Sequence, residues 1–135
     1  LVGMTFNCKS RPHVQSMILA TDAVALTHLL DSGTMACPPT MADAVQAEMS
    51  ITPVIQAAGY NVTALMTAYH SGLDYVTSCN HSDVLYEDSY WDTDIHPYDT
   101  GFIKANRNIN PLVIERLTEW HDGWGYSSYD FCGGV

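Results

Sequence analysis

The feature that most constrains the fold is a run of apolar residues at helical spacing in the first third of the chain. Ser10 followed by Pro12 is typical of a helix start, with Ser as N-cap and Pro in the first turn, and Gly33 is placed to end the helix. The apolar positions between them are Val14, Met17, Ile18, Val24, Ala25 and Leu29. Asp22 falls inside this arc at about 100° per residue. The pattern therefore predicts a helix with an inward-facing carboxylate, which must be paired, hydrogen-bonded or metal-bound because burying a lone charge is costly.

The next segment predicts a second helix that also turns an acid inward. Thr40 with Asp43 has the form of a capping box, so a helix should begin at Met41 and run to about residue 50, with Pro53 starting a fresh turn. The apolar face of this helix has Glu48 near its middle. Two inward-facing carboxylates on successive helices favour a shared polar site over two separate structural acceptors.

The rest of the chain predicts one domain. Asn110 and Pro111 indicate the start of a last helix that ends near Gly123, whereas residues 61–70 fit a strand and a helical face equally well. A chain of 135 residues with 47% hydrophobic and 15% charged residues is long enough to bury a core. We therefore expect a mainly α fold over residues 1–135: a single compact α-rich domain of about four helices, with or without a minor small β-sheet.

The composition limits the partners and the location of the chain. Fifteen acidic residues against five basic ones give a net charge of −10, which argues against non-specific, charge-driven binding of nucleic acid. There is no apolar run long enough to cross a bilayer and no signal-peptide pattern at Leu1. We expect a monomer with no membrane partner, in the cytoplasm rather than secreted.

Several common kinds of site are absent from the sequence. The cysteines Cys8, Cys37, Cys79 and Cys132 include no Cys-x-x-Cys pair, so a zinc finger is a poor fit, and up to two disulfides remain possible in any of three pairings. There is no Gly-x-Ser-x-Gly, no P-loop and no Gly-x-Gly-x-x-Gly. Acyl transfer, P-loop nucleotide hydrolysis and dinucleotide redox chemistry are therefore disfavoured.

Residues 91–99, with the sequence WDTDIHPYD, concentrate ionisable groups in a short stretch. In an extended segment Asp92 and Asp94 project to the same side, and His96 continues their row. Pro97 keeps the segment out of an interior strand. A row of two carboxylates and an imidazole can hold a divalent cation. The alternative is an acidic surface loop whose aromatic rings pack against the core.

These acids together predict a metal-dependent catalytic site. The expected metal ligands are Asp22, Glu48, Asp94 and His96. This oxygen-rich set with one nitrogen suits a divalent ion, zinc or magnesium, with water in the open positions. The expected catalytic residues are Asp22, His70, His96 and Lys104, among which the two histidines can move protons near neutral pH.

Three further residues have the right types to hold a substrate. Lys104 and Arg107 place two bases within three residues of each other in a very acidic chain, which indicates a local anion site. Tyr60 and Tyr98 are candidates for stacking on a base or a sugar. The expected substrate-binding residues are therefore Tyr60, Tyr98 and Arg107.

Three groups of segments carry a resemblance to known proteins. They are LVGMTFNC at residues 1–8, HVQSM at 13–17 with ATD at 20–22, and DIHPY at 94–98 with KANR at 104–107. These segments resemble the ribotoxin-like proteins of mushrooms (the ageritin group) and a set of larger, related fungal glycosyltransferase-like proteins, whose C-terminal part carries similar segments. The small size of the chain and the lack of an upstream catalytic domain favour the first group.

The resemblance to the first group implies a divalent-metal-dependent endoribonuclease that inactivates ribosomes. Such proteins cleave one phosphodiester bond in the sarcin–ricin loop of the large, 28S-type ribosomal RNA, so the ribosome is the expected partner. The resemblance to the second group implies sugar or nucleotide-sugar binding, with Asp92-Thr93-Asp94 holding a metal on a diphosphate. The third alternative is a defence or storage protein whose polar cluster is purely structural.

Overall fold

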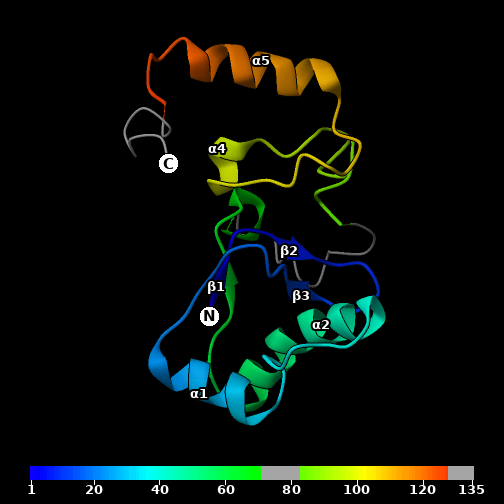
Figure 1. Cartoon of the computed structure of the whole chain (residues 1–135), viewed down its shortest axis with the longest axis vertical. Helices are drawn as coiled ribbons and strands as arrows, with labels where there is room; N and C mark the ends of the chain where they lie inside the picture. Colours follow the sequence, from blue (N-terminus) through cyan, green and yellow to red (C-terminus); the bar gives the residue numbers. More distant parts are fainter. Residues whose placement is uncertain (71–82, 128–135) are drawn as a thin grey trace.

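The computed structural model of the chain describes residues 1–70 and 83–127. Of the described residues, 39% lie in helices and 9% in strands. α1 and α2 lie at one end of the molecule, the strands lie in the middle, and α5 lies at the opposite end (Figure 1). The fold is mixed α/β, and the expectation of a mainly α domain is wrong.

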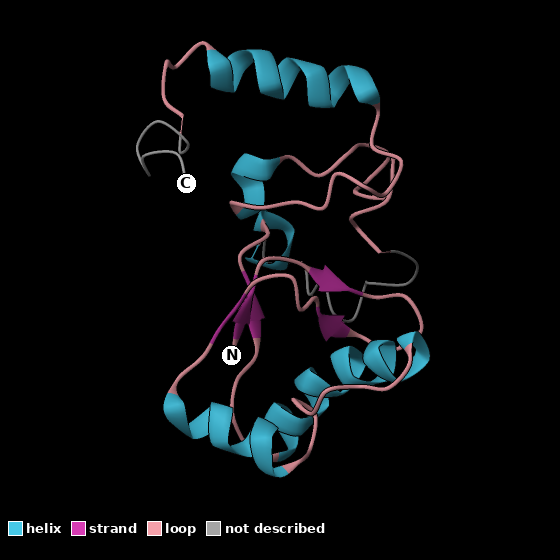
Figure 2. Cartoon of the chain, in the orientation of Figure 1, coloured by secondary structure: helices cyan, strands magenta, loops and turns pink. Residues whose placement is uncertain are grey.

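The strands of the described residues are all two residues long. They are β1 (Val2–Gly3), β2 (Phe6–Asn7), β3 (His13–Val14), β4 (Leu19–Ala20) and β5 (Thr63–Ala64). β1 lies between β4, to which it is antiparallel, and β5, to which it is parallel, while β2 and β3 form a separate antiparallel pair (Figure 2). Strands this short leave almost no alternation in the sequence, which explains why hydrophobic periodicity failed to detect them.

Gly3 fixes how closely the two small sheets approach. A Cβ added at Gly3 would lie 2.9 Å from the Cβ of Val14, which is closer than real side chains come. β1 can therefore pass over β3 only because residue 3 has no side chain. This contact joins the three-stranded sheet to the β2–β3 pair, and strands of two residues are too short to be stable alone.

The helix predicted from residue 13 begins ten residues later. Residues 13–20 contain β3 and β4, and α1 spans Ala23–Asp31. Asp22 is the N-cap of α1: its Oδ1 accepts a hydrogen bond from the backbone N–H of Ala25 at 2.8 Å. The prediction that Asp22 lies inside an apolar helical arc is therefore wrong, because the residue precedes the helix and is exposed.

The second predicted helix is confirmed, but it is longer than expected. α2 spans Met41–Ala57 and is capped by Thr40, whose Oγ1 accepts from the N–H of Asp43 at 3.2 Å. It continues through Pro53, so the predicted break is wrong. Thr52, beside the proline, is buried and accepts a hydrogen bond from the N–H of Val14 at 2.9 Å. Packing against β3 therefore stabilises the turn in which the proline removes a helical hydrogen bond.

The remaining helical segments all lie after residue 66. Residues 61–70 contain both β5 and a 3₁₀ turn, η1 (Thr67–His70), so neither of the two alternatives describes the whole segment. α4 spans Pro97–Thr100, and the predicted last helix is confirmed as α5 (Pro111–Asp122), capped by Asn110. None of the residues of α5 is buried.

The core lies between the strands, α1, α2 and the segment that follows residue 82. Its members are Phe6, Cys8, Val14, Ala25, Leu29, Ile51, Ile55, Ala64, Met66, Ala68, Val84, Leu85 and Ile95. A buried polar chain ties the N-terminal hairpin to this later segment. Thr5 Oγ1 donates to Gln15 Oε1 at 2.6 Å, and Gln15 Nε2 donates to Asp83 Oδ1 at 2.9 Å. The buried carboxylate of the structure is thus Asp83 rather than Asp22.

Two of the four cysteines are described. Cys8 is disulfide-bonded, and Cys37 is an exposed free thiol. With Cys37 free, no more than one disulfide can form within the chain. Among the described residues, no helix has both the length and the apolar character needed to cross a membrane.

Candidate functional site

Two of the predicted metal ligands serve as helix caps. Asp22 caps α1, and the rest of its side chain is exposed to solvent. His96 caps α4: its Nδ1 accepts a hydrogen bond from the N–H of Tyr98 at 3.1 Å. A nitrogen that accepts this bond has its lone pair occupied, so only the other ring nitrogen of His96 is open to a ligand.

Asp94 joins two loops through their backbones. Its Oδ1 accepts from the N–H of Asp88 at 3.0 Å, and its Oδ2 accepts from the N–H of Asn110 at 3.4 Å. The neighbouring Asp92 is exposed and has a backbone φ of 58°, so the two carboxylates are not part of one extended row. The prediction of an extended row at Asp92, Asp94 and His96 is therefore wrong.

The four predicted ligands do not fit one metal ion. In residues 1–70 and 83–127, no three His, Cys, Asp or Glu side chains are grouped so that they could hold a metal. Asp22, Asp94 and His96 each accept a hydrogen bond from a different piece of backbone. The zinc or magnesium requirement remains a prediction.

Glu48 is the predicted site residue with the most developed environment. Its Oε1 accepts hydrogen bonds from both the backbone N–H and the Oγ of Ser16, each at 2.8 Å. Burial alone would raise the pKa of the carboxyl group. The two hydrogen bonds from Ser16 and the positive fields of His13 and Lys104 outweigh that effect, so the pKa of Glu48 is lowered and the group is ionised at neutral pH.

This arrangement brings together two residues that the sequence proposed independently. Glu48 comes from α2 and Lys104 from the segment between α4 and α5, and the positive field of Lys104 acts on the carboxylate. Both hydrogen bonds from Ser16 go to Oε1, and among the described residues none goes to Oε2. Glu48 is only half-buried, so part of the ionised carboxylate is open to solvent within the positive field of Lys104.

His13 is a third member of this site, and the sequence analysis treated it only as the start of a helix. It lies in β3, which packs on α2, and its Nδ1 is 2.6 Å from the carbonyl oxygen of Arg11. Because a carbonyl can only accept, Nδ1 carries the proton of that bond and Nε2 is left for another partner. The side chain is buried, at 4% exposure.

Arg107, three residues after Lys104, belongs to a second cluster. Its Nη1 donates to Tyr86 Oη at 2.9 Å, and its guanidinium carbon lies 5.0 Å from the centre of the Tyr86 ring. Lys9 Nζ lies 5.8 Å from the same centre. We refer to Lys9, Tyr86 and Arg107 as the Tyr86 cluster. The sequence proposed Arg107 as an anion-binding residue but gave no sign of Lys9 or Tyr86.

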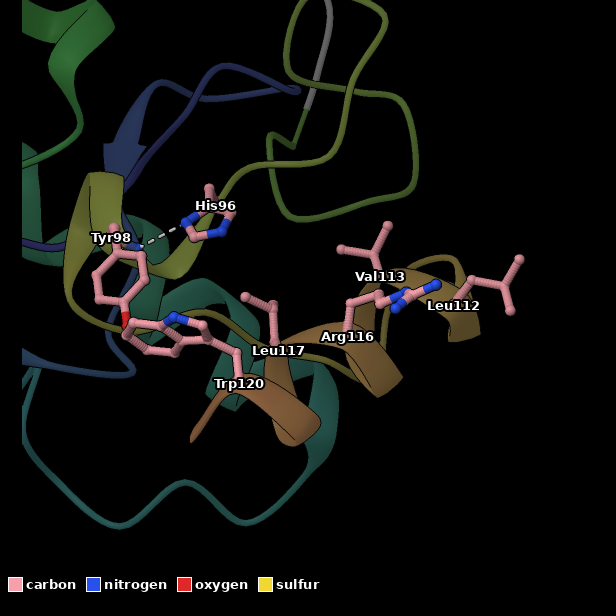
Figure 3. Close-up of a pocket in the computed structure, with 7 residues that line it drawn as sticks. All are labelled: His96, Tyr98, Leu112, Val113, Arg116, Leu117 and Trp120. Atoms are coloured by element: carbon pink, nitrogen blue, oxygen red, sulfur yellow. Dashed lines mark hydrogen bonds between the residues drawn. The ribbon is translucent and has the colours of Figure 1, made fainter. Parts of the chain in front are cut away.

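His96 and Tyr98 line an open groove between α4 and α5 (Figure 3). The groove has a volume of about 620 Å³. Its other lining residues, all from α5, are Leu112, Val113, Arg116, Leu117 and Trp120. The His96 and Tyr98 rings are stacked with centres 5.1 Å apart, and Trp120 meets Tyr98 edge-on at 4.9 Å. This groove is apolar and aromatic, unlike the Glu48 site.

The last two predicted residues are separate from these clusters. Tyr60 follows α2, is 43% exposed, and has its ring centre 5.5 Å from that of His28 in α1. His70 is the last residue of η1, and its side chain lies outside the described part of the molecule. Their proposed roles in stacking and proton transfer stay predictions.

The residues that the sequence analysis missed are joined to the site by tertiary contacts. Lys9 and His13 lie on or beside the β2–β3 hairpin, Ser16 follows β3, and Tyr86 lies in the segment after residue 82. The one available signal was charge, because Lys9 is one of only five basic residues in the chain.

Comparison of the chain with protein-family models, with curated proteins and with solved structures found no match in any of the three.

Proposed function

We propose that the chain is an endoribonuclease that cleaves the sarcin–ricin loop of large ribosomal RNA, with Glu48 and Lys104 at the reacting phosphodiester. The observation that carries this proposal is the half-buried Glu48 carboxylate, with one oxygen held by Ser16 and with its pKa lowered in part by the positive field of Lys104. A carboxylate in the field of a cation offers the two groups that phosphodiester cleavage by the RNA's own 2′-hydroxyl requires: a proton acceptor and a stabiliser of negative charge.

The chemistry follows from these two groups. Glu48 Oε2 accepts the proton of the ribose 2′-hydroxyl, whose oxygen forms a bond to phosphorus. Lys104 stabilises the extra negative charge on the phosphoryl oxygens as this bond forms. The bond from phosphorus to the 5′ oxygen then breaks, and that oxygen takes a proton from water. The products are a 2′,3′-cyclic phosphate and a 5′-hydroxyl.

The arrangement of charge also fits a polyanionic substrate better than the net charge suggests. Four of the five basic residues lie in two short segments: Lys9 and Arg11 in the β2–β3 hairpin, and Lys104 and Arg107 between α4 and α5. Lys9 and Arg107 meet on one ring, so these segments are neighbours. A local positive surface can hold RNA on a protein whose net charge is −10.

Intact ribosomes provide the direct test. We expect the protein to release one discrete fragment from the large ribosomal RNA that ends in a 2′,3′-cyclic phosphate, and Glu48→Gln to release none under the same conditions. Parallel reactions with a chelator will show whether the predicted divalent metal is required. Absence of the fragment with the unmodified protein, with and without added zinc or magnesium, would exclude the proposed function.

A further inference from the structure

Two cations reach the same aromatic ring from distant parts of the chain. Lys9 comes from the β2–β3 hairpin and Arg107 from the segment before α5, and both lie over Tyr86, which is 38% exposed. A cation over an aromatic face is weakly stabilised by the ring quadrupole. Two like charges on one ring, however, repel each other, so the ring alone does not explain why both are there.

No carboxylate in residues 1–70 and 83–127 forms an ion pair with Lys9 or Arg107. Within the described residues the one ion pair joins Arg116 to Glu119 on α5, at 3.5 Å. Glu87 follows Tyr86 directly, but it is joined to Arg107 only through the backbone, by its N–H and the Arg107 carbonyl at 3.2 Å. Two cations without an acidic partner in the described part of the chain make a ligand a candidate source of the negative charge.

One nitrogen of the Arg107 guanidinium group has no hydrogen-bond acceptor among the described residues. Nη1 is used by Tyr86 Oη, and Nε is buried without a partner in the described structure. A buried donor without an acceptor is rare in folded proteins and often marks an unseen water or ion. An anionic oxygen at this edge of the guanidinium group, directly or through one water, would satisfy Nε and reach Lys9 at the same time.

We infer that the Tyr86 cluster is a phosphate-binding site that holds an RNA backbone phosphate next to the one that is cleaved. This inference rests on the proposed function, and it adds Lys9 and Tyr86 as substrate-positioning residues. Arg107 lies three residues after Lys104, which bounds the distance between their Cα atoms at roughly 10 Å. That spacing is suited to adjoining phosphates of one strand. Tyr86 acts by holding Arg107 in place through its hydroxyl group and ring.

Binding can be measured separately from cleavage. The probe is a hairpin oligonucleotide with the sarcin–ricin loop sequence and 2′-deoxy sugars, which lacks the attacking hydroxyl group and cannot be cut by the proposed route. We expect its affinity, followed by fluorescence anisotropy, to fall with salt. In Lys9→Ala with Arg107→Ala, the slope of log affinity against log salt should be smaller by about 0.7, since the cluster holds one phosphate and each phosphate contact to a single strand contributes about 0.7.

Matched variants separate the site from general charge and from folding. Arg116→Ala removes one positive charge on α5 and should leave the probe affinity within about twofold after allowing for net charge. Lys9→Glu changes an exposed turn residue, so it should keep the fold while weakening the probe more than Lys9→Ala does. Tyr86→Phe keeps the ring but loses the hydroxyl acceptor of Arg107, and should weaken the probe several-fold. Circular dichroism melting confirms that each variant is folded.

The outcomes distinguish this inference from the proposed function. If the folded Lys9 and Arg107 variants bind the probe with an unchanged slope, the Tyr86 cluster is not a phosphate site, whether or not ribosomes are cleaved. The same conclusion follows if Arg116→Ala is as damaging as Arg107→Ala. If the slope falls as expected but the unmodified protein cuts no ribosomal RNA, the phosphate site stands and the nuclease proposal fails.

Discussion

The Tyr86 cluster and the groove between α4 and α5 both expose aromatic rings, but their surroundings are opposite. Tyr86 carries two cations without a carboxylate nearby in an ion pair, whereas Tyr98 is surrounded by His96, Trp120 and the aliphatic side chains of α5. The one cation of the groove, Arg116, is exposed and already paired with Glu119. An aromatic residue is therefore not a binding signal by itself, because its neighbours decide which ligand it suits.

The two regions also differ in how they are built into the fold. Lys9, from the Tyr86 cluster, lies in the β2–β3 hairpin and Glu48 lies on α2. The hairpin and α2 share the buried core through Val14, Thr52 and Ile55. α5 contributes no buried residue, and the groove depends on contacts between exposed rings. Positioned charges for chemistry require rigid support, and only the first region has it.

The largest expected effect concerns Glu48, the proposed general base. Glu48→Gln removes the proton acceptor but keeps the size of the side chain and an oxygen for Ser16. We expect the rate of ribosomal RNA cleavage to fall on the order of 10³-fold, within the range for general-base catalysis, while affinity for the 2′-deoxy probe changes little. The measurement is the initial rate of fragment release under single-turnover conditions.

The matched control for this variant is Glu115→Gln, an exposed acid on α5 without a hydrogen bond among the described residues. It removes the same charge from the other region and should cleave at the rate of the unmodified protein. Equal losses in the two variants would show that net charge, and not the position of Glu48, controls the reaction.

The next effect concerns the cation beside Glu48. Lys104→Ala removes the group that faces the phosphoryl oxygens in the transition state, and we expect a loss on the order of 10²-fold in cleavage rate. Arg116→Ala, on the groove side, should lose less than about twofold. If Lys104→Ala weakens only probe binding and leaves the single-turnover rate at saturating protein intact, Lys104 binds the substrate without taking part in the reaction.

Some of these features could be predicted from the sequence and others could not. The caps at Thr40 and Asn110 were predictable because capping depends on residues within one turn of the helix start. Asp22 was misplaced because Val14, in β3, and Met17 and Ile18, between β3 and β4, happened to continue the helical spacing of α1. A prediction from hydrophobic periodicity cannot distinguish a long helix from a shorter one that is preceded by two-residue strands, when the apolar residues before the helix continue the same spacing.

Residue types in the sequence pointed to some residues of the site, but not to the side chains that they contact. Glu48, Lys104 and Arg107 stood out because a charge inside an apolar pattern, or a base in an acidic chain, is visible locally. Their partners Ser16, His13 and Tyr86 come from segments tens of residues away, and no spacing rule connects them. Among the predicted metal ligands, Asp22 and His96 are helix N-caps, and Asp94 accepts hydrogen bonds from the backbone of two loops.

A smaller effect is expected in stability, with a defined dependence on pH. Because the pKa of Glu48 is lowered in the folded protein, the ionised carboxylate stabilises the fold at pH values above its ordinary pKa. This contribution is lost as the pH falls through the lowered, folded-state pKa. Glu48→Gln should therefore cost about 1 kcal/mol of unfolding free energy near neutral pH and nothing measurable in strong acid. Urea unfolding at a series of pH values measures this difference.

The same unfolding series on Glu115→Gln is the reference, and its difference from the unmodified protein should be small and flat with pH. A Glu48→Gln difference that grows on acidification would mean that burial, not the Ser16 bonds and nearby cations, dominates this carboxylate. That result would also remove the argument that Glu48 is ionised in the site.

The smallest expected effect tests the groove and sharpens the contrast with the Tyr86 cluster. Tyr98→Ala removes the most exposed ring of the groove, at 64% exposure, and we expect the 2′-deoxy probe to bind about fivefold more weakly, the lower end for stacking on one base. The acids Glu115, Glu119 and Asp122 on α5 disfavour a close phosphate backbone, which keeps this contribution small. Because stacking involves no counterion release, the salt slope should not change. A reduced slope in Tyr98→Ala would show that the groove and the Tyr86 cluster hold the same stretch of backbone, and the distinction between a charged and an apolar surface would no longer describe how this protein binds RNA.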